Sequence, residues 1–123
     1  MADVDVYQLF LRGTELLEKG DYHQAAVPLR QARDADPGKS SIREALGRAL
    51  FLAQHYEEAA GEFAAIVEQA PTNDYALFCL GRSLQQLGRH RDSLPPLAQA
   101  ASLRPERGDY RRYRDRARAA CAR

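Results

Sequence analysis

The feature that most constrains the fold of this chain is a 34-residue period in its glycines and prolines. The residues that recur at this interval are Gly13, Gly47 and Gly81, and Pro37, Pro71 and Pro105. The chain has only eight Gly and six Pro, so two independent sets with one spacing indicate an internal repeat. A period of this length is typical of repeat proteins, in which each unit buries its apolar face only against its neighbours.

Each repeat is predicted to form two helices. In the first half, apolar residues recur at helical spacing, as at positions 77, 80 and 84. The second halves, residues 25–35, 59–70 and 93–103, end just before the periodic prolines, because proline disfavours helical backbone in the residue before it. Gly20 and Gly88 are expected to end first helices, and Asp21 is expected to cap the helix that follows it.

Three prolines lie inside the predicted second helices, at positions 28, 95 and 96. Proline removes a backbone hydrogen bond from a helix interior and distorts it. We expect a bend at these positions and not a break, because the repeat pattern continues through them.

The pattern resembles the tetratricopeptide repeat family over residues 4–105. The eight signature positions of that family are aromatic or apolar, Leu, Gly, aromatic or apolar, Ala, aromatic or apolar, Ala and Pro. By residue class, 22 of the 24 positions in three repeats fit, and Arg12 and Arg43 are the exceptions. We expect both Arg side chains to lay their stems along apolar surface and to keep the charged end in water.

The resemblance implies an all-α, right-handed superhelical solenoid of helix-turn-helix repeats. We expect one domain over residues 1–123, with repeats at about 6–39, 40–73 and 74–107. A further helix at about 107–122 has an apolar face that includes Tyr110, Tyr113 and Ala117. It is predicted to cap the last repeat, which gives about seven helices in all.

No constellation of residues predicts catalysis. The three histidines, His23, His55 and His90, lie near predicted turns without the spacing of metal ligands, so we expect surface histidines. Ser93 and Cys79 have no adjacent base, and the glycines form no phosphate-binding loop. We therefore expect no enzyme activity, no metal and no cofactor.

Composition favours a cytoplasmic protein. The chain has no apolar run of about 18 residues and no secretory signal pattern at its start, so neither a membrane location nor secretion is predicted. Cys79 and Cys121 are too few for a disulfide framework, and we expect two reduced thiols.

In the family that the chain resembles, the first helix of each repeat lines a concave groove that holds peptides or partner helices. The residues predicted for this groove are Tyr7, Phe10, Thr14, Ser41, Glu44, Arg48, Phe51, Tyr75, Phe78, Arg82, Gln85 and Arg112. They include half of the ten aromatic residues, and three Arg face a single Glu; aromatics and Arg are favoured at binding hot spots. The alternative is that some of these aromatics pack against neighbouring first helices and complete the core.

Chaperone-binding members of the family hold a C-terminal carboxylate with a Lys, Asn, Asn, Lys, Arg set. The matching positions are Phe10, Thr14, Ala45, Tyr75 and Cys79. None of them matches, so a carboxylate-clamp ligand is not expected.

The leading functional hypothesis is a non-catalytic adaptor, scaffold or chaperone-like module that binds a peptide or helix with acidic and apolar residues. One alternative is a structural subunit that forms a homo-oligomer through its groove or its C-terminal helix. A weaker alternative is nucleic-acid association through residues 104–123, which hold eight Arg and three acidic residues. Charge runs of this kind are more often solvated faces, which disfavours nucleic acid as a partner.

Overall fold

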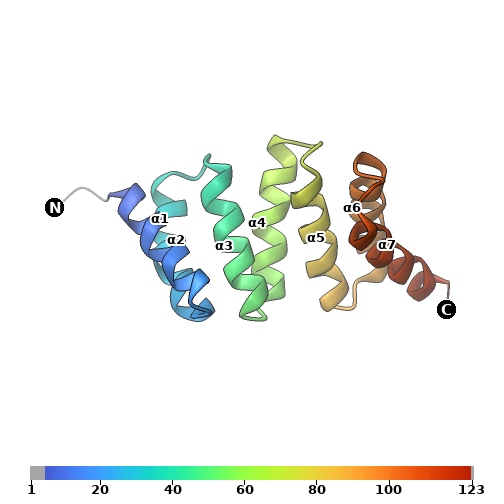
Figure 1. Cartoon of the computed structure of the whole chain (residues 1–123), viewed down its shortest axis with the longest axis horizontal. Coiled ribbons are helices and arrows are strands. Elements are labelled where there is room, and N and C mark those ends of the chain that lie inside the picture. The colour runs from blue at the N-terminus through green and yellow to red at the C-terminus, as the bar shows by residue number, and fades with distance from the viewer. Residues whose placement is uncertain (1–4, 123) are drawn as a thin grey trace. The chain divides into compact units, whose positions relative to one another are not determined.

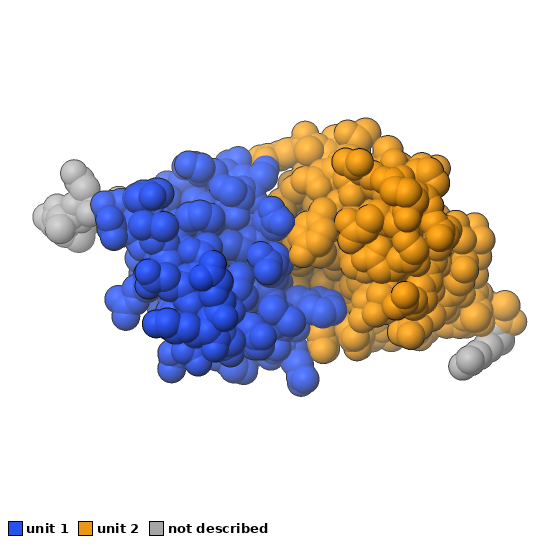
Figure 2. Space-filling model, viewed as in Figure 1, with its two compact units in different colours: residues 1–55 blue, residues 56–123 orange. Residues whose placement is uncertain are grey.

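The computed structural model describes residues 5–122 (Figure 1). Seven α-helices make up the regular structure of this range, and they are α1 (Val6–Glu18), α2 (Tyr22–Ala35), α3 (Ser40–Leu52), α4 (Tyr56–Gln69), α5 (Asp74–Gln86), α6 (His90–Leu103) and α7 (Gly108–Cys121). The chain divides into two compact units, residues 1–55 and 56–123 (Figure 2). The all-α repeat fold is confirmed, and the single domain over three repeats stays a prediction.

Unit 1 is held together by the packing of α2 against both α1 and α3. Ala25, Leu29 and Ala32 on α2 are fully buried. A Cβ atom on Gly13 would lie 2.4 Å from Cγ of Leu29, so only glycine permits this approach of α1 to α2. The periodic glycine is therefore a helix-contact residue, as the repeat pattern predicts.

Unit 2 repeats this arrangement 68 residues later. A Cβ atom on Gly81 would lie 2.4 Å from Cγ of Leu97, which is fully buried on α6. Helix α5 packs against α4 and α6, and α6 packs against α7. Both units therefore use one glycine–leucine contact to bring the two helices of a repeat together.

The turn inside each repeat has a residue in the left-handed backbone region. Gly20 and Gly88 have φ of 84° and 76°, and they follow the first helices as predicted. In the second repeat Gln54 takes this conformation with φ of 67°. A side chain is disfavoured there because its Cβ approaches the following carbonyl oxygen. The second repeat therefore keeps the turn geometry without the residue that suits it best.

Helices α2, α4 and α6 each begin three residues before their predicted starts. Helices α2 and α6 continue through their prolines without a break. The expectation that the Asp21 side chain caps α2 is wrong. Asp21 lies at the N-cap, but its side chain makes no capping bond, and its carbonyl oxygen accepts from the Ala25 amide at 2.8 Å. Side-chain caps occur instead at α1 and α5, where Asp5 and Asn73 accept from backbone amides at 3.1 Å.

Arg43 replaces a large apolar residue of the family pattern, and its position has a structural reason. Its Nε donates to the carbonyl oxygen of Pro37 at 2.8 Å. The charged end therefore bonds to the backbone, whereas it is expected from the sequence to lie in water. In unit 2, Arg111 donates in the same way to the carbonyl oxygen of Pro105, 68 residues further on. Arg12, the other exception, is exposed.

Helix α7 is anchored to unit 2 through Tyr110, which is fully buried beside Leu77 and Ala100. Its hydroxyl donates to Oδ2 of Asp74 at 2.7 Å, and Nε of Arg104 lies 3.5 Å from Oδ1 of the same carboxylate. Burial raises the pKa of Asp74, but the bond from Tyr110 and the charge of Arg104 outweigh it and leave the pKa below its usual value. The capping helix is confirmed.

Within residues 5–122, no helix has both the length and the apolar character that crossing a membrane requires.

Candidate functional site

The predicted groove residues are distributed over both units. Seven lie on α1 and α3 in unit 1, four lie on α5 in unit 2, and Arg112 lies on α7. A single groove that joins the two sets stays a prediction.

In unit 1, a hollow of about 550 Å³ brings three of the predicted residues together at the start of α1 and α3. The residues that line it are Asp5, Val6, Tyr7, Phe10, Asp36, Lys39, Ser41 and Ile42. Tyr7 is 64% exposed, so its ring is available to a ligand without any rearrangement of the core. The lining combines four apolar or aromatic residues with four polar ones, and three of the polar residues, Asp5, Asp36 and Lys39, are charged.

The other predicted residues of unit 1 differ in what they offer a ligand. Glu44 and Arg48 are exposed on α3 and four residues apart, a spacing at which opposite charges attract. The Thr14 hydroxyl donates to the carbonyl oxygen of Leu11 at 3.0 Å, so it is bonded within its own helix. Phe51 is half-buried. Tyr7 and Phe10, which line the hollow, and the exposed Arg48 are therefore the best placed of this set.

In unit 2, Phe78 packs between helices and does not stand free. Its ring stacks on Tyr110 with centroids 4.6 Å apart and meets the edge of Tyr113 at 5.7 Å. It also packs against the buried cluster around Leu77. Phe78 thus follows the alternative interpretation of the sequence, in which groove aromatics complete the core.

Arg82 is part of a network that joins α5 to α7. Its guanidinium carbon lies 3.9 Å from the Tyr113 ring centroid, and its Nη1 donates to Oε1 of Gln85 at 2.9 Å. Gln85 in turn donates to the carbonyl oxygen of Tyr113 at 2.8 Å. Arg116 approaches the same ring at 4.9 Å. Two guanidinium groups therefore converge on one tyrosine.

Burial lowers the pKa of Arg82, and the charge of Arg116 adds to this effect against the opposing influence of Tyr113. Arg82 remains a cation because arginine is not deprotonated in proteins. The sequence pattern places Tyr113 on the packing face of the cap and does not single out Arg116. Their spacing of three residues places them on one side of α7, and this spacing was the available signal.

Other arginines of α7 and its preceding loop lie against carboxylates. Nη2 of Arg107 is 2.8 Å from Oδ2 of Asp109, and Nη2 of Arg114 is 2.9 Å from Oδ1 of Asp115. Arg112 is exposed. The positive charge of this segment is thus partly matched by acidic side chains on the same segment.

Ser93, which has no adjacent base in the sequence, is hydrogen-bonded within its own helix. The Ser93 hydroxyl donates to the carbonyl oxygen of His90 at 2.8 Å within α6. In the part of the chain that is described, no group of three or more His, Cys, Asp or Glu side chains is placed to hold a metal ion.

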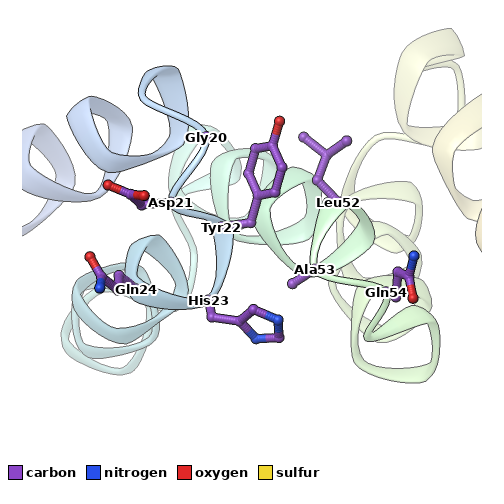
Figure 3. A pocket seen from close by; sticks show the side chains of 8 residues that line it. All are labelled: Gly20, Asp21, Tyr22, His23, Gln24, Leu52, Ala53 and Gln54. Atoms are coloured by element: carbon purple, nitrogen blue, oxygen red, sulfur yellow. The ribbon is translucent and has the colours of Figure 1, made fainter.

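A second hollow of unit 1, of about 440 Å³, lies between the start of α2 and the turn after α3 (Figure 3). His23 lies at this hollow, and its Nδ1 is 3.3 Å from Nε2 of His55. The sequence gives no signal that these histidines form a pair, because they are 32 residues apart and the packing of α2 on α3 brings them together.

Comparisons with known proteins concern both sequence and fold. A family model described as tetratricopeptide repeat matches residues 10–74. No curated protein sequence matches the chain at a significant level. Among solved structures, MamA of MSR-1 is similar with 23% identity and a TM-score of 0.88, covering 97% of this chain and 68% of its own.

Two further structures have the same fold. The first TPR of Spaghetti (RPAP3), bound to the HSP90 peptide SRMEEVD, is 17% identical with a TM-score of 0.88, and the match covers 96% of this chain and 94% of that one. MamA residues 41 to the end from Desulfovibrio magneticus RS-1 is 20% identical with a TM-score of 0.83, covering 96% and 72%. At these identities the likeness is one of fold.

Proposed function

Because the chain belongs to the tetratricopeptide repeat family, we propose that it is a non-catalytic, cytoplasmic protein-interaction module that binds a peptide or helical segment of a partner protein. It would act as an adaptor, scaffold or chaperone-like protein. The observation that carries this proposal is the hollow of unit 1, where Tyr7, Phe10 and Ser41 come together at one surface.

The chemistry of the proposed ligand follows from the side chains on offer. An apolar side chain would enter the hollow beside Tyr7 and Phe10, because buried aromatic contacts supply much of the energy of typical interfaces. Acidic side chains would pair with Arg48 in unit 1, since hydrogen bonds to charged groups are strong.

The similarity to the peptide-bound TPR of RPAP3 supports an acidic ligand, because the peptide SRMEEVD in that structure carries three acidic residues. This chain would hold an acidic ligand through contacts other than the carboxylate clamp of the family. Phe10, Thr14, Ala45, Tyr75 and Cys79 stand at the family's carboxylate-clamp positions. We therefore propose an internal acidic and apolar segment as the ligand, and not a C-terminal carboxylate.

The proposal is tested by selecting binders from a random peptide library and measuring the affinity of the best sequence for matched variants. Tyr7→Ala removes an exposed ring at the hollow, and Val27→Ala is its control, because Val27 is also apolar and 54% exposed but lies on α2. We expect Tyr7→Ala to weaken binding about tenfold or more and Val27→Ala to leave it unchanged. Arg48→Glu should weaken binding of acidic peptides and reduce its salt dependence.

Equal affinity of wild type and Tyr7→Ala would show that the hollow is not the binding site. The selection also separates the other hypotheses. A self-associating subunit predicts light scattering that rises with protein concentration, and a nucleic-acid binder predicts salt-sensitive binding to generic DNA or RNA that falls when α7 arginines are replaced.

A further inference from the structure

His23, which lines the second hollow of unit 1, and its neighbour His55 have no part in the proposed function. His23 lies in the first turn of α2, and His55 follows the turn after α3. Both are exposed. Figure 3 shows the His23 ring extending toward the turn that carries Ala53 and Gln54, whereas the Asp21 side chain points away from it.

The separation of the two rings fits one cation between them. Nδ1 of His23 and Nε2 of His55 are 3.3 Å apart, which is longer than most hydrogen bonds from nitrogen. Two nitrogens bound to one tetrahedral cation, at about 2.0–2.1 Å each, lie about 3.3–3.4 Å apart, and the centroids of their rings lie about 5.2 Å apart. The observed centroids are 5.1 Å apart. The rings are thus at the separation of two ligands of one metal ion.

The repeat gives an independent comparison for this pair. The residues 34 positions further on are Glu57 and Arg89 in unit 2, whose Oε2 and Nη2 atoms form an ion pair at 2.8 Å. This position therefore links the second helix of one repeat to the turn that follows the first helix of the next. In unit 1 the two charged groups are replaced by two imidazoles, whose facing nitrogens lie at a long hydrogen-bonding distance of 3.3 Å. A bound cation would hold both nitrogens at once and take the place of that contact.

We propose that His23 Nδ1 and His55 Nε2 together bind one divalent transition-metal cation, of the class of Zn²⁺ or Ni²⁺, with water at its remaining positions. Imidazole nitrogen suits these cations, whereas Mg²⁺ and Ca²⁺ prefer oxygen ligands. Binding holds the start of α2 against the turn after α3. It stabilises unit 1, because the unfolded chain does not keep together two residues that are 32 positions apart.

The experiment uses the full chain without a histidine tag and measures binding of ZnCl₂ and NiCl₂ by titration calorimetry, with thermal melting in parallel. We expect one cation per chain and a higher melting temperature with the metal. His23→Ala or His55→Ala should weaken binding tenfold to a hundredfold or more, since even the loss of a residue that only supports a metal ligand costs about that much. His90→Ala, which changes the third histidine, is the matched control and should bind as wild type does.

The decisive variant combines His23→Glu with His55→Arg, which copies the Glu57–Arg89 ion pair into unit 1. It should keep the helicity and melting temperature of the metal-free wild type and should lose the rise in melting temperature that the metal produces. The proposal is overturned if wild type shows no saturable binding at millimolar cation, or if this double variant binds as tightly as wild type. The double variant also provides the test should either alanine variant fail to fold.

Discussion

The hydroxyl group of Tyr110 is predicted to contribute measurably to stability, and Tyr110→Phe removes that group alone. The ring of the variant keeps its stack on Phe78 at 4.6 Å and its place in the buried cluster. The loss is the 2.7 Å hydrogen bond to the Asp74 carboxylate. Hydrogen bonds to charged groups contribute about 1.5–3 kcal/mol.

Two features of Asp74 reduce the free energy that is lost with this hydrogen bond. Arg104 remains 3.5 Å from the other carboxylate oxygen, and the side chain is 22% exposed, so water can replace part of the lost bond. We therefore expect Tyr110→Phe to lower the free energy of unfolding by about 1–2 kcal/mol. For a chain of this size, that change lowers the melting temperature by about 4–8 °C.

The effect should depend on pH in a defined direction. The pKa of Asp74 is lowered in the fold, so its contribution to stability is present above the pKa of the unfolded chain and is lost as the pH falls through the folded pKa. The unfolded value is about 3.9. The difference between wild type and Tyr110→Phe should be largest near pH 7 and should shrink below about pH 4.

The assay is thermal and urea unfolding followed by circular dichroism at several pH values. Tyr113→Phe is the matched control, because the ring of Tyr113 makes its contacts with Phe78 and Arg82 and keeps both without the hydroxyl. Equal stability of wild type and Tyr110→Phe at pH 7, or a difference that persists unchanged in acid, would refute the assignment of the Asp74 bond as the anchor of α7.

Four other changes test the packing. Gly81→Ala should destabilise the protein by about 1–3 kcal/mol in urea unfolding, because its Cβ would lie 2.4 Å from Cγ of Leu97. Gly61→Ala on α4 has open space around its Cβ and should stabilise the protein by about 0.5–1 kcal/mol. The reverse order of stability would contradict the packing. Gln54→Gly should stabilise by about 1 kcal/mol, since it relieves a left-handed backbone at a residue with a side chain; an unchanged melting temperature would count against strain there. Deletion of residues 107–123 should lower solubility and the melting temperature by exposing Ala100 and Ala101, and a truncated chain as stable as the whole would contradict the capping role.

The repeat fold could be predicted from the sequence because its helix ends and closest contacts depend on residues with distinct physical properties. Proline ends a helix and glycine permits close approach wherever they occur, so the spacing of Gly13 and Gly81 alone was enough to assign both to helix contacts. The turn at Gln54 shows the limit of this reasoning, since an ordinary residue can take the same conformation when the surrounding helices require it.

The candidate site was less predictable because its chemistry depends on which helices meet. Arg82 was expected to offer its charge to a ligand, but α7 places Tyr113 under its guanidinium group. His23 and His55 carry no local signal of a pair, and Asp21 is a good capping residue whose side chain does not cap. These outcomes depend on side-chain directions across packed helices, which helical spacing alone does not determine.

The short reach of the contacts between helices has a consequence for how the chain folds. The hydrogen bond from Tyr110 to Asp74 spans 36 residues, and the contact between the two histidines spans 32. The helices pack on their neighbours or next neighbours in the sequence, and helical proteins rich in local contacts fold within microseconds to milliseconds, because little loop-closure entropy is lost before each contact forms. Proteins are made at about 5–20 residues per second, so the first helix pair can pack long before the residues of α7 have been synthesised. Folding of this chain should therefore keep pace with translation, starting from α1 and α2.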